Sequence, residues 1–497
     1  MSHLPDQAQD LPRRRNRRPR CIPLPGGSTS LSGRLSAAIP LVLLGLGAAC
    51  AKDPQPIAGQ PGSGGATGTP DAGASDGPPM LAGTVTVPRA GTHPVPALAF
   101  GQNYWNWEPE WGDAIAGTDQ LVKAAGVRLI RAGGANNELQ TPSPFATAQL
   151  DDFVAYCKAA GAEPLLQVPL VKNAAGEPAG AADAAAMVTH ANVDMGYGVK
   201  YWSIGNEPDL YTMQGLQGAA YSAADYCATF RGYVTAMKAV DPSIKILGPE
   251  LSWKYVSGND WLTPFLDGCG DVVDIVSVHR YPFAPDRATV AAALGDATSF
   301  RQVVRSLRAN LDKHGLTATP LALTEAHITY DGDPSKSTLP ASPQTFYAGL
   351  WAADVLGVAL EENLWTSAFW HIADTASGWQ LAFIHAGTPR PTYYATQMFA
   401  TSFAGKVLAP TGVPAGFSVY ASRDDAVGKT VVVVLNKGSN AARLVLALEG
   451  GSSPDLPFPA ESLTLVTFTD GASAPALLRY TKDRADAEMP PAAVAGP

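Results

Sequence analysis

Short apolar runs alternate with helical periodicities between about residues 95 and 405 of the chain. One helical stripe is formed by Phe300, Val303, Val304, Leu307 and Leu311, which share a face of a 3.6-residue repeat. Such alternation predicts repeated strand–helix units. The eight expected strands lie at 97–101, 127–131, 164–168, 200–204, 244–248, 272–278, 321–324 and 364–369. Eight units over this length predict a (β/α)8 TIM barrel. A doubly wound open sheet is disfavoured, because no glycine-rich phosphate turn follows the first run.

The pattern changes after residue 405, where helical periodicity is lost and strand-like runs take over. These runs lie at 417–421, 430–435, 442–448 and 463–468, separated by turns such as Asn436-Lys437-Gly438. They predict a small C-terminal β-sandwich, and residues 84–87 are a candidate for an added strand. We therefore expect the barrel at 81–405, the sandwich at 406–480 and a flexible tail at 481–497.

The first fifty residues have the form of an export signal. Seven arginines precede the apolar run 35–49, which is too short to span a membrane comfortably. Cys50 follows Leu-Gly-Ala-Ala and resembles a bacterial lipoprotein processing site, although Gly47 stands where leucine is usual. Ordinary signal cleavage is the alternative. Residues 51–80 are rich in Gly, Pro and Ala and predict a flexible tether. The expected location is the cell envelope, as a lipoprotein of the outer membrane or cell surface, and otherwise the periplasm or the exterior.

Charge and cysteine content exclude several classes of protein. The net charge is -9, and it becomes -14 without the arginine-rich residues 1–50, so we expect no nucleic-acid partner. No other stretch approaches 18 apolar residues, which excludes a polytopic membrane protein. Beyond Cys50 the mature chain keeps Cys157, Cys227 and Cys269, which allow at most one disulfide. Their spacing suggests no metal site, and we predict no cofactor. The oligomeric state is left open.

Polar residues close the expected strands, where a barrel places its active site. They are Gln102, Asn103, Arg131, Gln167, Asn206, Glu207, Glu250, His279, Tyr281, Glu325, Trp370 and His371. Glu207 and Glu325 each follow an apolar strand directly, where burying a carboxylate is costly unless it serves a purpose. Two such carboxylates are what cleavage of a glycosidic bond requires, one protonated and one ionised. Glu250, with Glu108 and Glu110, is expected at a subsite or on the rim.

Five of these features together resemble clan A of the retaining glycoside hydrolases. They are Asn206-Glu207-Pro208, Glu325, His279-x-Tyr281, Arg131 and Trp370. Within the clan, the segment IGNEPDLY and the helix at 392–404 look most like the heparanase and β-glucuronidase family and its bacterial relatives. The Ala-His-Ile that follows Glu325 departs from the heparanase-like pattern.

The resemblance implies a role for each matching residue. Glu207 would be the general acid/base and Glu325 the nucleophile. Asn206 would bind the sugar 2-hydroxyl, and Trp370 would form the floor of the −1 subsite. Tyr281 and Arg131 would donate hydrogen bonds to Glu325 and keep it ionised. His279 belongs to the supporting set.

Aromatic residues are concentrated in the expected barrel, where all ten tryptophans lie between Trp105 and Trp379. Aromatic faces stack on the apolar faces of sugars, although each tryptophan taken alone is more often a core residue. Trp105 and Trp107 stand two positions apart in a polar loop after Asn103, so at least one of them should be exposed. We therefore add Asn103, Trp105 and Trp107 to the expected substrate-binding or supporting residues.

Three hypotheses follow for the function. The leading one is an exported, surface-tethered retaining glycosidase that cleaves O-glycosidic bonds in a poly- or oligosaccharide. The second is a non-catalytic carbohydrate-binding surface lipoprotein on the same barrel. The third is a structural surface protein, which the acidic, tryptophan-rich mouth argues against.

Overall fold

The computed structural model describes residues 80–105, 115–135, 138, 146–252, 254–255, 260–333, 340–375 and 381–495. The expected signal peptide, Cys50, almost all of the tether, Trp107, Glu108 and Glu110 lie outside these residues. Within them, no helix is both long and apolar enough to cross a bilayer.

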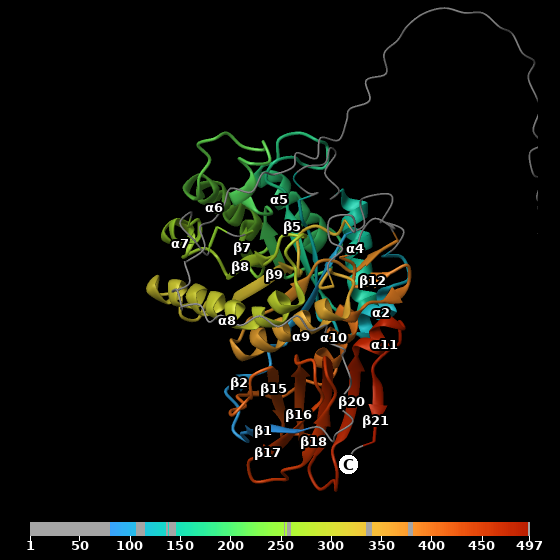
Figure 1. Ribbon diagram of the computed structural model, residues 1–497. Helices are drawn as coiled ribbons and strands as arrows, with labels where there is room; N and C mark the ends of the chain where they lie inside the picture. Colours follow the sequence, from blue (N-terminus) through green and yellow to red (C-terminus); the bar gives the residue numbers. More distant parts are fainter. Residues whose placement is uncertain are drawn as a thin grey trace, which may run out of the picture. The chain divides into compact units, whose positions relative to one another are not determined.

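Eight parallel strands close into a barrel, in the order β10-β3-β4-β5-β6-β7-β8-β9 (Figure 1). Their bounds are Phe100–Tyr104 (β3), Leu129–Ala132 (β4), Glu163–Val168 (β5), Tyr201–Ile204 (β6), Lys245–Leu251 (β7), Ile275–Arg280 (β8), Leu321–Ala326 (β9) and Ser367–Phe369 (β10). The TIM-barrel prediction is confirmed. Most of the expected strands stop too early, because β3, β7, β8 and β9 continue into polar residues that an apolar run does not include.

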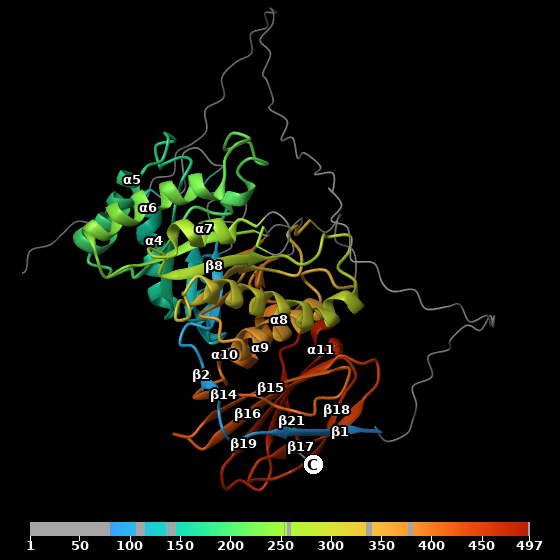
Figure 2. The same cartoon turned by 90° about the vertical axis from the view of Figure 1, so that its left-hand side faces the viewer.

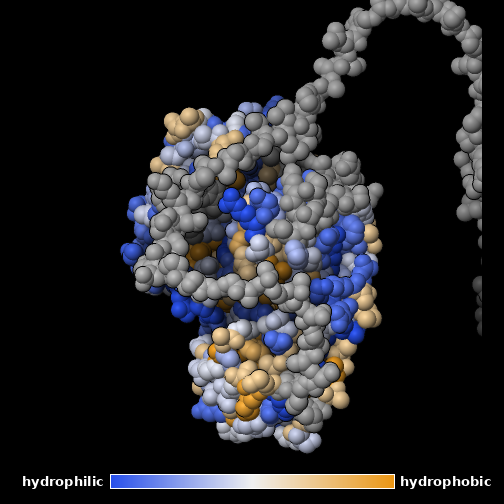
Figure 3. All heavy atoms as spheres, in the orientation of Figure 1, coloured by the Kyte–Doolittle hydropathy of each residue, from blue (hydrophilic) through white to orange (hydrophobic). Residues whose placement is uncertain are grey.

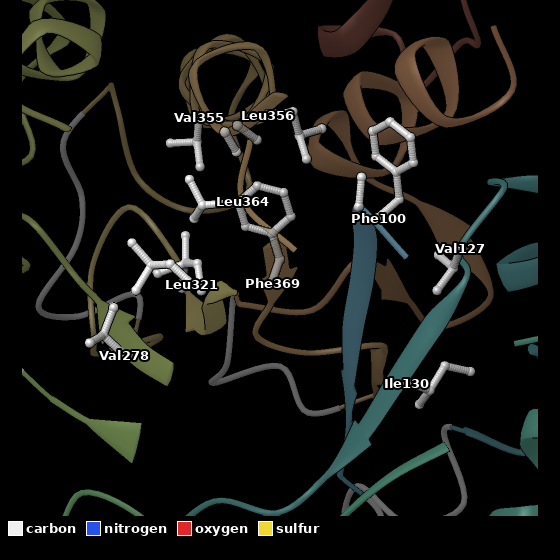
Figure 4. Packing of buried hydrophobic residues seen from close by; sticks show 14 of the residues in the cluster. Phe100, Val127, Ile130, Val278, Leu321, Val355, Leu356, Leu364 and Phe369 are labelled. Carbon is white, nitrogen blue, oxygen red and sulfur yellow. The ribbon is translucent and has the colours of Figure 1, made fainter. Parts of the chain in front are cut away.

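Helices surround the barrel and are placed by their apolar stripes. They are Asp119–Ala124 (α2), Thr147–Ala160 (α4), Ala181–Val188 (α5), Ala223–Val240 (α6), Leu262–Cys269 (α7), Val290–Lys313 (α8), Phe346–Glu361 (α9) and Pro391–Ala400 (α10). The expected stripe lies on α8, where Phe300, Val304, Leu307 and Leu311 are buried. Between α9 and the barrel wall, Val355 and Leu356 approach Phe369 of β10 (Figure 4).

Helix α6 begins at a reciprocal cap and is joined covalently to α7. Ser222 accepts a hydrogen bond from the Asp225 backbone N–H, and the Asp225 carboxylate accepts one from the Ser222 N–H in return. A disulfide connects Cys227 of α6 to Cys269 at the end of α7, and Cys157 is a buried free thiol. The single disulfide that the cysteine count allows is therefore formed.

Two further sheets pack face to face as a sandwich (Figure 2). The larger sheet has the order β2-β14-β15-β16-β19-β20-β21, and the smaller one has the order β1-β17-β18. Their bounds are Met80–Val87 (β1), His93–Pro94 (β2), Lys406–Leu408 (β14), Phe417–Asp424 (β15), Lys429–Asn436 (β16), Ala442–Leu448 (β17), Asp455–Phe458 (β18), Ser462–Thr469 (β19), Ala476–Thr481 (β20) and Ala492–Val494 (β21). In the space-filling view, hydrophobic residues gather over these sheets (Figure 3).

Strand β16 explains why the larger sheet is so apolar. Val432 and Val434 face the core shared with the smaller sheet, whereas Val431, Val433 and Leu435 belong to the cluster that contains the barrel helices. Successive side chains of a strand point to opposite faces, so a strand covered on both sides becomes a continuous apolar run.

Two of the expected boundaries are wrong. Strands β1 and β2 lie in the segment assigned to the barrel, with Met80 assigned to the tether, but they pair with β17 and β14. The pairing of β1 confirms residues 84–87 as an added strand of the sandwich. The β1–β17 pairing is parallel and spans the whole barrel in sequence, so the alternation at 84–87 does not show which strand is its partner. The tail assigned to 481–497 contains helix Lys482–Asp486 (α11) and β21, which pairs with β20. Its alanine-rich edge strand carries little hydrophobic signal.

The barrel meets the larger sheet where α9 lies against β15. The Tyr420 hydroxyl of β15 donates to Asp354 Oδ1 of α9 at 2.8 Å, and Lys437 Nζ lies 2.9 Å from Asp354 Oδ2. A Cβ at Gly357 would come within 2.3 Å of the Tyr420 ring, so the close approach of helix and strand requires glycine at this position. We call this contact the junction.

Candidate active site

Glu207 and Glu325 lie side by side at the carboxyl end of the barrel. Glu207 follows β6, and Glu325 lies within β9. A carboxylate oxygen of each, together with one His279 ring nitrogen, lie within 4.8 Å of one another. Barrel closure therefore brings together two residues that stand far apart in the sequence, as we expected.

Glu325 is held as an acceptor of two hydrogen bonds. The Tyr281 hydroxyl donates to Oε1 at 2.6 Å, and Arg131 Nη1 donates to Oε2 at 3.1 Å. These are the two donors that the resemblance implied. A charged donor and a short hydroxyl bond favour the ionised carboxylate. Burial raises the pKa of Tyr281, and the nearby Glu325 raises it further because deprotonation would place a second negative charge beside the first. The Tyr281 hydroxyl therefore keeps its proton and remains a donor.

Glu207 has a different environment. Its backbone is left-handed, with φ 49°, and it caps the short helix Pro208–Leu210 (η3). Burial raises the pKa of Glu207, the nearby charge of Glu325 raises it further, and the hydrogen bond with His279 opposes both. That bond joins His279 Nδ1 to Glu207 Oε1 at 3.0 Å. Glu207 is thus the glutamate whose surroundings favour a bound proton, whereas Glu325 accepts two hydrogen bonds.

Arg131 is the fully buried centre of the cluster. Besides Glu325, its guanidinium donates to Asn103 Oδ1 at 2.9 Å and to Asn206 Oδ1 at 2.8 Å. Asn103 is itself buried, and its amide donates to the backbone oxygens of Thr324 and Phe369. Asn103 of β3 therefore links β4, β9 and β10 and supports the site from beneath, whereas Asn206 stands next to Glu207.

Glu250 is not on the rim, which corrects the expectation from the sequence. It is completely buried, because β7 continues to Leu251 and carries Glu250 inside the barrel end. Its Oε2 lies 2.7 Å from His279 Nε2 and accepts from the Thr324 hydroxyl. Burial alone would raise the pKa of Glu250, but Arg131, His279 and Thr324 together hold it at about 2. The apolar Leu251 was the signal that the strand had not ended.

His279 lies between Glu207 and Glu250 with both ring nitrogens engaged. Burial lowers its pKa, but Glu325, Glu207 and Glu250 outweigh this and raise it to about 10. An imidazolium has a proton on each nitrogen and no lone pair for a metal. The spacing of Glu207, His279 and Glu325 would suit an ion, but both ring nitrogens of His279 already contact carboxylates, Nδ1 that of Glu207 and Nε2 that of Glu250.

Trp370 follows β10 and packs on Trp105, with ring centroids 5.2 Å apart. Leu381 and Tyr281 complete this cluster. Trp370 and Trp105 are only 8% and 7% exposed, so Trp105 is a packing partner of Trp370 and not an exposed platform. Gly134 approaches Trp370 so closely that a Cβ would lie 2.7 Å from Cη2. The sequence did not reveal this packing, because it depends on two loops from opposite ends of the barrel sequence.

Glu138 is a buried carboxyl group that the sequence did not single out. It accepts from the backbone N–H groups of Leu170 and Val171 and from the Gln167 amide. Burial raises its pKa to about 7 against these hydrogen bonds. The group ties the segment after β4 to the end of β5. The surrounding NNELQ has no periodic signal that would have indicated burial.

Comparison with known proteins agrees with this geometry. Residues 168–341 match the family model described as "Glycosyl hydrolase catalytic core". This segment contains Glu207, Glu250, His279 and Glu325. A search of curated proteins found no match.

Three solved structures show the same fold. CelM2, a bifunctional glucanase-xylanase from a metagenome library, is 18% identical with a TM-score of 0.61, covering 78% of this chain and 99% of its own. A family 51 α-L-arabinofuranosidase from Bifidobacterium longum is 16% identical with a TM-score of 0.60, covering 78% and 97%. A family 44 xyloglucanase from Paenibacillus polymyxa is 16% identical with a TM-score of 0.58, covering 78% and 99%. These structures share the barrel fold of this chain, and the matching family model agrees with the resemblance to glycoside hydrolases. The narrower placement beside heparanase and β-glucuronidase stays a prediction.

Proposed function

We propose that this chain is an exported, retaining glycoside hydrolase acting on O-glycosidic bonds in an oligo- or polysaccharide. The observation that carries the proposal is the pair Glu207 and Glu325, whose nearest oxygens lie within 4.8 Å. Retaining enzymes place their two carboxyl groups about 5 to 5.5 Å apart, whereas inverting enzymes need about 6.5 to 9.5 Å to admit a water.

The environments of the two glutamates support the role that we propose for each. In the first step, the ionised Glu325 attacks the anomeric carbon while Glu207 gives its proton to the glycosidic oxygen, and the aglycone leaves. In the second step, Glu207 takes a proton from water, the water oxygen attacks the same carbon, and the ester to Glu325 breaks. Two displacements return the original anomeric configuration.

The similar structures support carbohydrate hydrolysis and suggest where to look for the substrate. These proteins are a glucanase-xylanase, a xyloglucanase and an arabinofuranosidase, so a first panel should contain the corresponding aryl glycosides and polysaccharides. Sugar and linkage depend on the loops, and we propose neither.

The test has two parts. On a substrate from the panel, the product released first should carry the anomeric configuration of the substrate, read by proton NMR during the first turnovers. Glu325→Gln and Glu207→Gln should each lower kcat by at least about 10³-fold on an unactivated substrate with the fold intact. An inverted first product would refute the retaining assignment. Binding of glycans without product would favour the carbohydrate-binding alternative.

Export and lipidation are also proposals. The Cys227–Cys269 disulfide supports an oxidising compartment, since disulfides are rare in the cytosol. Lipidation of Cys50 would hold the barrel at a membrane through the tether. Cell fractionation should find the chain in the membrane fraction and Cys50→Ala in the soluble fraction. A Cys50→Ala protein that stayed with the membrane would contradict the anchor.

A further inference from the structure

Glu250 is a third carboxylate of the site, and the two displacement steps make no use of it. It is connected to Glu207, the proposed acid/base residue, in two ways. Its side chain contacts His279, which contacts Glu207, and its backbone oxygen accepts from the Glu207 N–H at 3.0 Å. Both residues have a left-handed backbone, with φ 56° at Glu250 and 49° at Glu207. Left-handed residues other than glycine are uncommon and cluster at functional sites.

The contacts of His279 fix which of its atoms carry protons. Nε2 faces Glu250 and Nδ1 faces Glu207, and a carboxylate oxygen is an acceptor. Glu250 Oε2 also accepts from the Thr324 hydroxyl, so Nε2 is the donor in its contact with Glu250. The contact at Nδ1 is a hydrogen bond from the ring to an unprotonated Glu207 Oε1 when Nδ1 also carries a proton, which makes the ring an imidazolium. The other charged and titratable groups around it are Glu325, with Oε2 3.9 Å from Nδ1, Arg131, Tyr281 and Tyr255, whose hydroxyl donates to the His279 backbone oxygen.

We propose that Glu250 is a positioning residue that keeps His279 doubly protonated, so that the His279 Nδ1–H holds Glu207 Oε1 and leaves Oε2 to carry the proton for the leaving oxygen. This inference rests on the proposed function. It assigns a task to a residue that does not reach the substrate, since Glu250 is completely buried.

The chemistry shows what would fail without Glu250. A neutral His279 whose proton remained on Nε2 would present Nδ1 as an acceptor. The protonated Glu207 would then donate to His279 instead of to the glycosidic oxygen. The site would keep both glutamates and Arg131, but the hydrogen bond between His279 and Glu207 would run from Glu207 to His279 and not from His279 to Glu207.

The simpler alternative is that Glu250 only balances the charge of Arg131. The distances do not favour it, because Arg131 Nη2 lies 3.6 Å from Glu250, whereas His279 Nε2 lies at 2.7 Å. The two roles also predict different effects. A counterion would support every reaction of the site equally, whereas a positioning residue for the acid would matter only where the leaving group needs a proton.

The first experiment follows the His279 ring in the resting enzyme by ¹⁵N NMR across a pH series. In the wild type the ring should stay doubly protonated through the neutral range, and in Glu250→Gln it should lose a proton at lower pH. An unchanged His279 titration in Glu250→Gln would overturn the proposal. This readout needs no turnover, so it separates failure of the inference from failure of the proposed function.

The second experiment compares two aryl glycosides of the sugar found in the panel. For the phenyl glycoside, whose leaving group needs a proton, Glu250→Gln should lower kcat/KM on the order of 10²-fold. For the 2,4-dinitrophenyl glycoside, which departs without one, the loss should stay below about threefold because acid catalysis contributes little there. Equal losses on both would overturn the positioning role and favour the counterion.

Two further variants keep the test decisive if Glu250→Gln folds poorly. Glu250→Asp keeps the charge but shortens the side chain, so positioning predicts the same leaving-group dependence and a counterion predicts near-normal rates. Asp354→Asn is the matched control, because it neutralises a buried carboxylate at the junction, away from His279. It should show no leaving-group dependence. Wild-type inactivity on every glycoside would refute the proposed function, while the NMR result would still decide the state of His279.

Discussion

The barrel mouth and the junction both bury charged groups, but the ratio of carboxyl groups to cations differs between them. At the junction, the Asp354 carboxylate has its own cation, Lys437, and a tyrosine hydroxyl. At the mouth, three carboxyl groups share the two cations Arg131 and His279. A buried carboxyl group in excess of the cations is stabilised by holding a proton. An excess of buried carboxyl groups over cations, more than burial itself, therefore distinguishes a site for proton transfer from a structural ion pair.

Removing one cation from each region should give the largest contrast. Arg131→Met leaves Glu250 and Glu325 without their guanidinium, so we expect kcat to fall by about 10³-fold or more and stability to fall by about 3 to 5 kcal/mol. Lys437→Met should lower stability by about 3 kcal/mol and leave kcat of the folded enzyme unchanged. Urea denaturation and initial rates measure both.

If kcat fell in both variants in proportion to their loss of stability, the expected difference between the mouth and the junction would be contradicted. That outcome would mean that the mouth acts only as a second structural cluster.

The pH dependence of stability should sharpen the comparison next. Since the pKa of Glu250 falls from 4.5 to about 2 on folding, its contribution is present above pH 4.5 and is lost as the pH falls through about 2. A shift of this size corresponds to about 3 kcal/mol. The pKa of His279 rises from 6.5 to about 10, so its contribution is full below pH 6.5 and is lost as the pH rises through about 10.

Denaturant unfolding at a series of pH values measures this dependence. The stability difference between wild type and Glu250→Gln should shrink by about 3 kcal/mol between about pH 5 and pH 2. A difference that stays constant over that range would show that Glu250 is not held ionised by its neighbours.

The smallest effect concerns the shape of the mouth. Gly134→Ala would place a Cβ 2.7 Å from Trp370, at a φ of 106°, so the indole must move. The resemblance implies that Trp370 forms the floor of the −1 subsite, and on that prediction displacing its ring should lower kcat/KM by about 10²-fold. Gly196→Ala is the matched control, because Gly196 also has a positive φ, 64°, but a Cβ there meets nothing within 4 Å. It should cost about 1 kcal/mol of stability and no activity. Similar kinetics in both variants would show that Trp370 does not shape the site.

Much of the site was predictable because residues at the carboxyl ends of barrel strands point into the active-site face. The apolar runs located the strands, and the residues that followed them included Arg131, Glu207, Tyr281 and Glu325. The contacts of Arg131 and Tyr281 with Glu325 agree with the expectation. The position of Glu250 was missed because the expected strand stopped at residue 248, although the apolar Leu251 beyond Glu250 indicates that the strand continues.

The sequence by itself determined the number of barrel strands, the main strands of the sandwich and the pair of glutamates, because hydrophobicity and its periodicity are local properties of a chain. Only the tertiary structure decided that β1 joins β17, that Trp105 packs on Trp370 and that Glu250 reaches His279. Those contacts join segments far apart in the sequence, and their energy depends on distances that exist only after the barrel has closed.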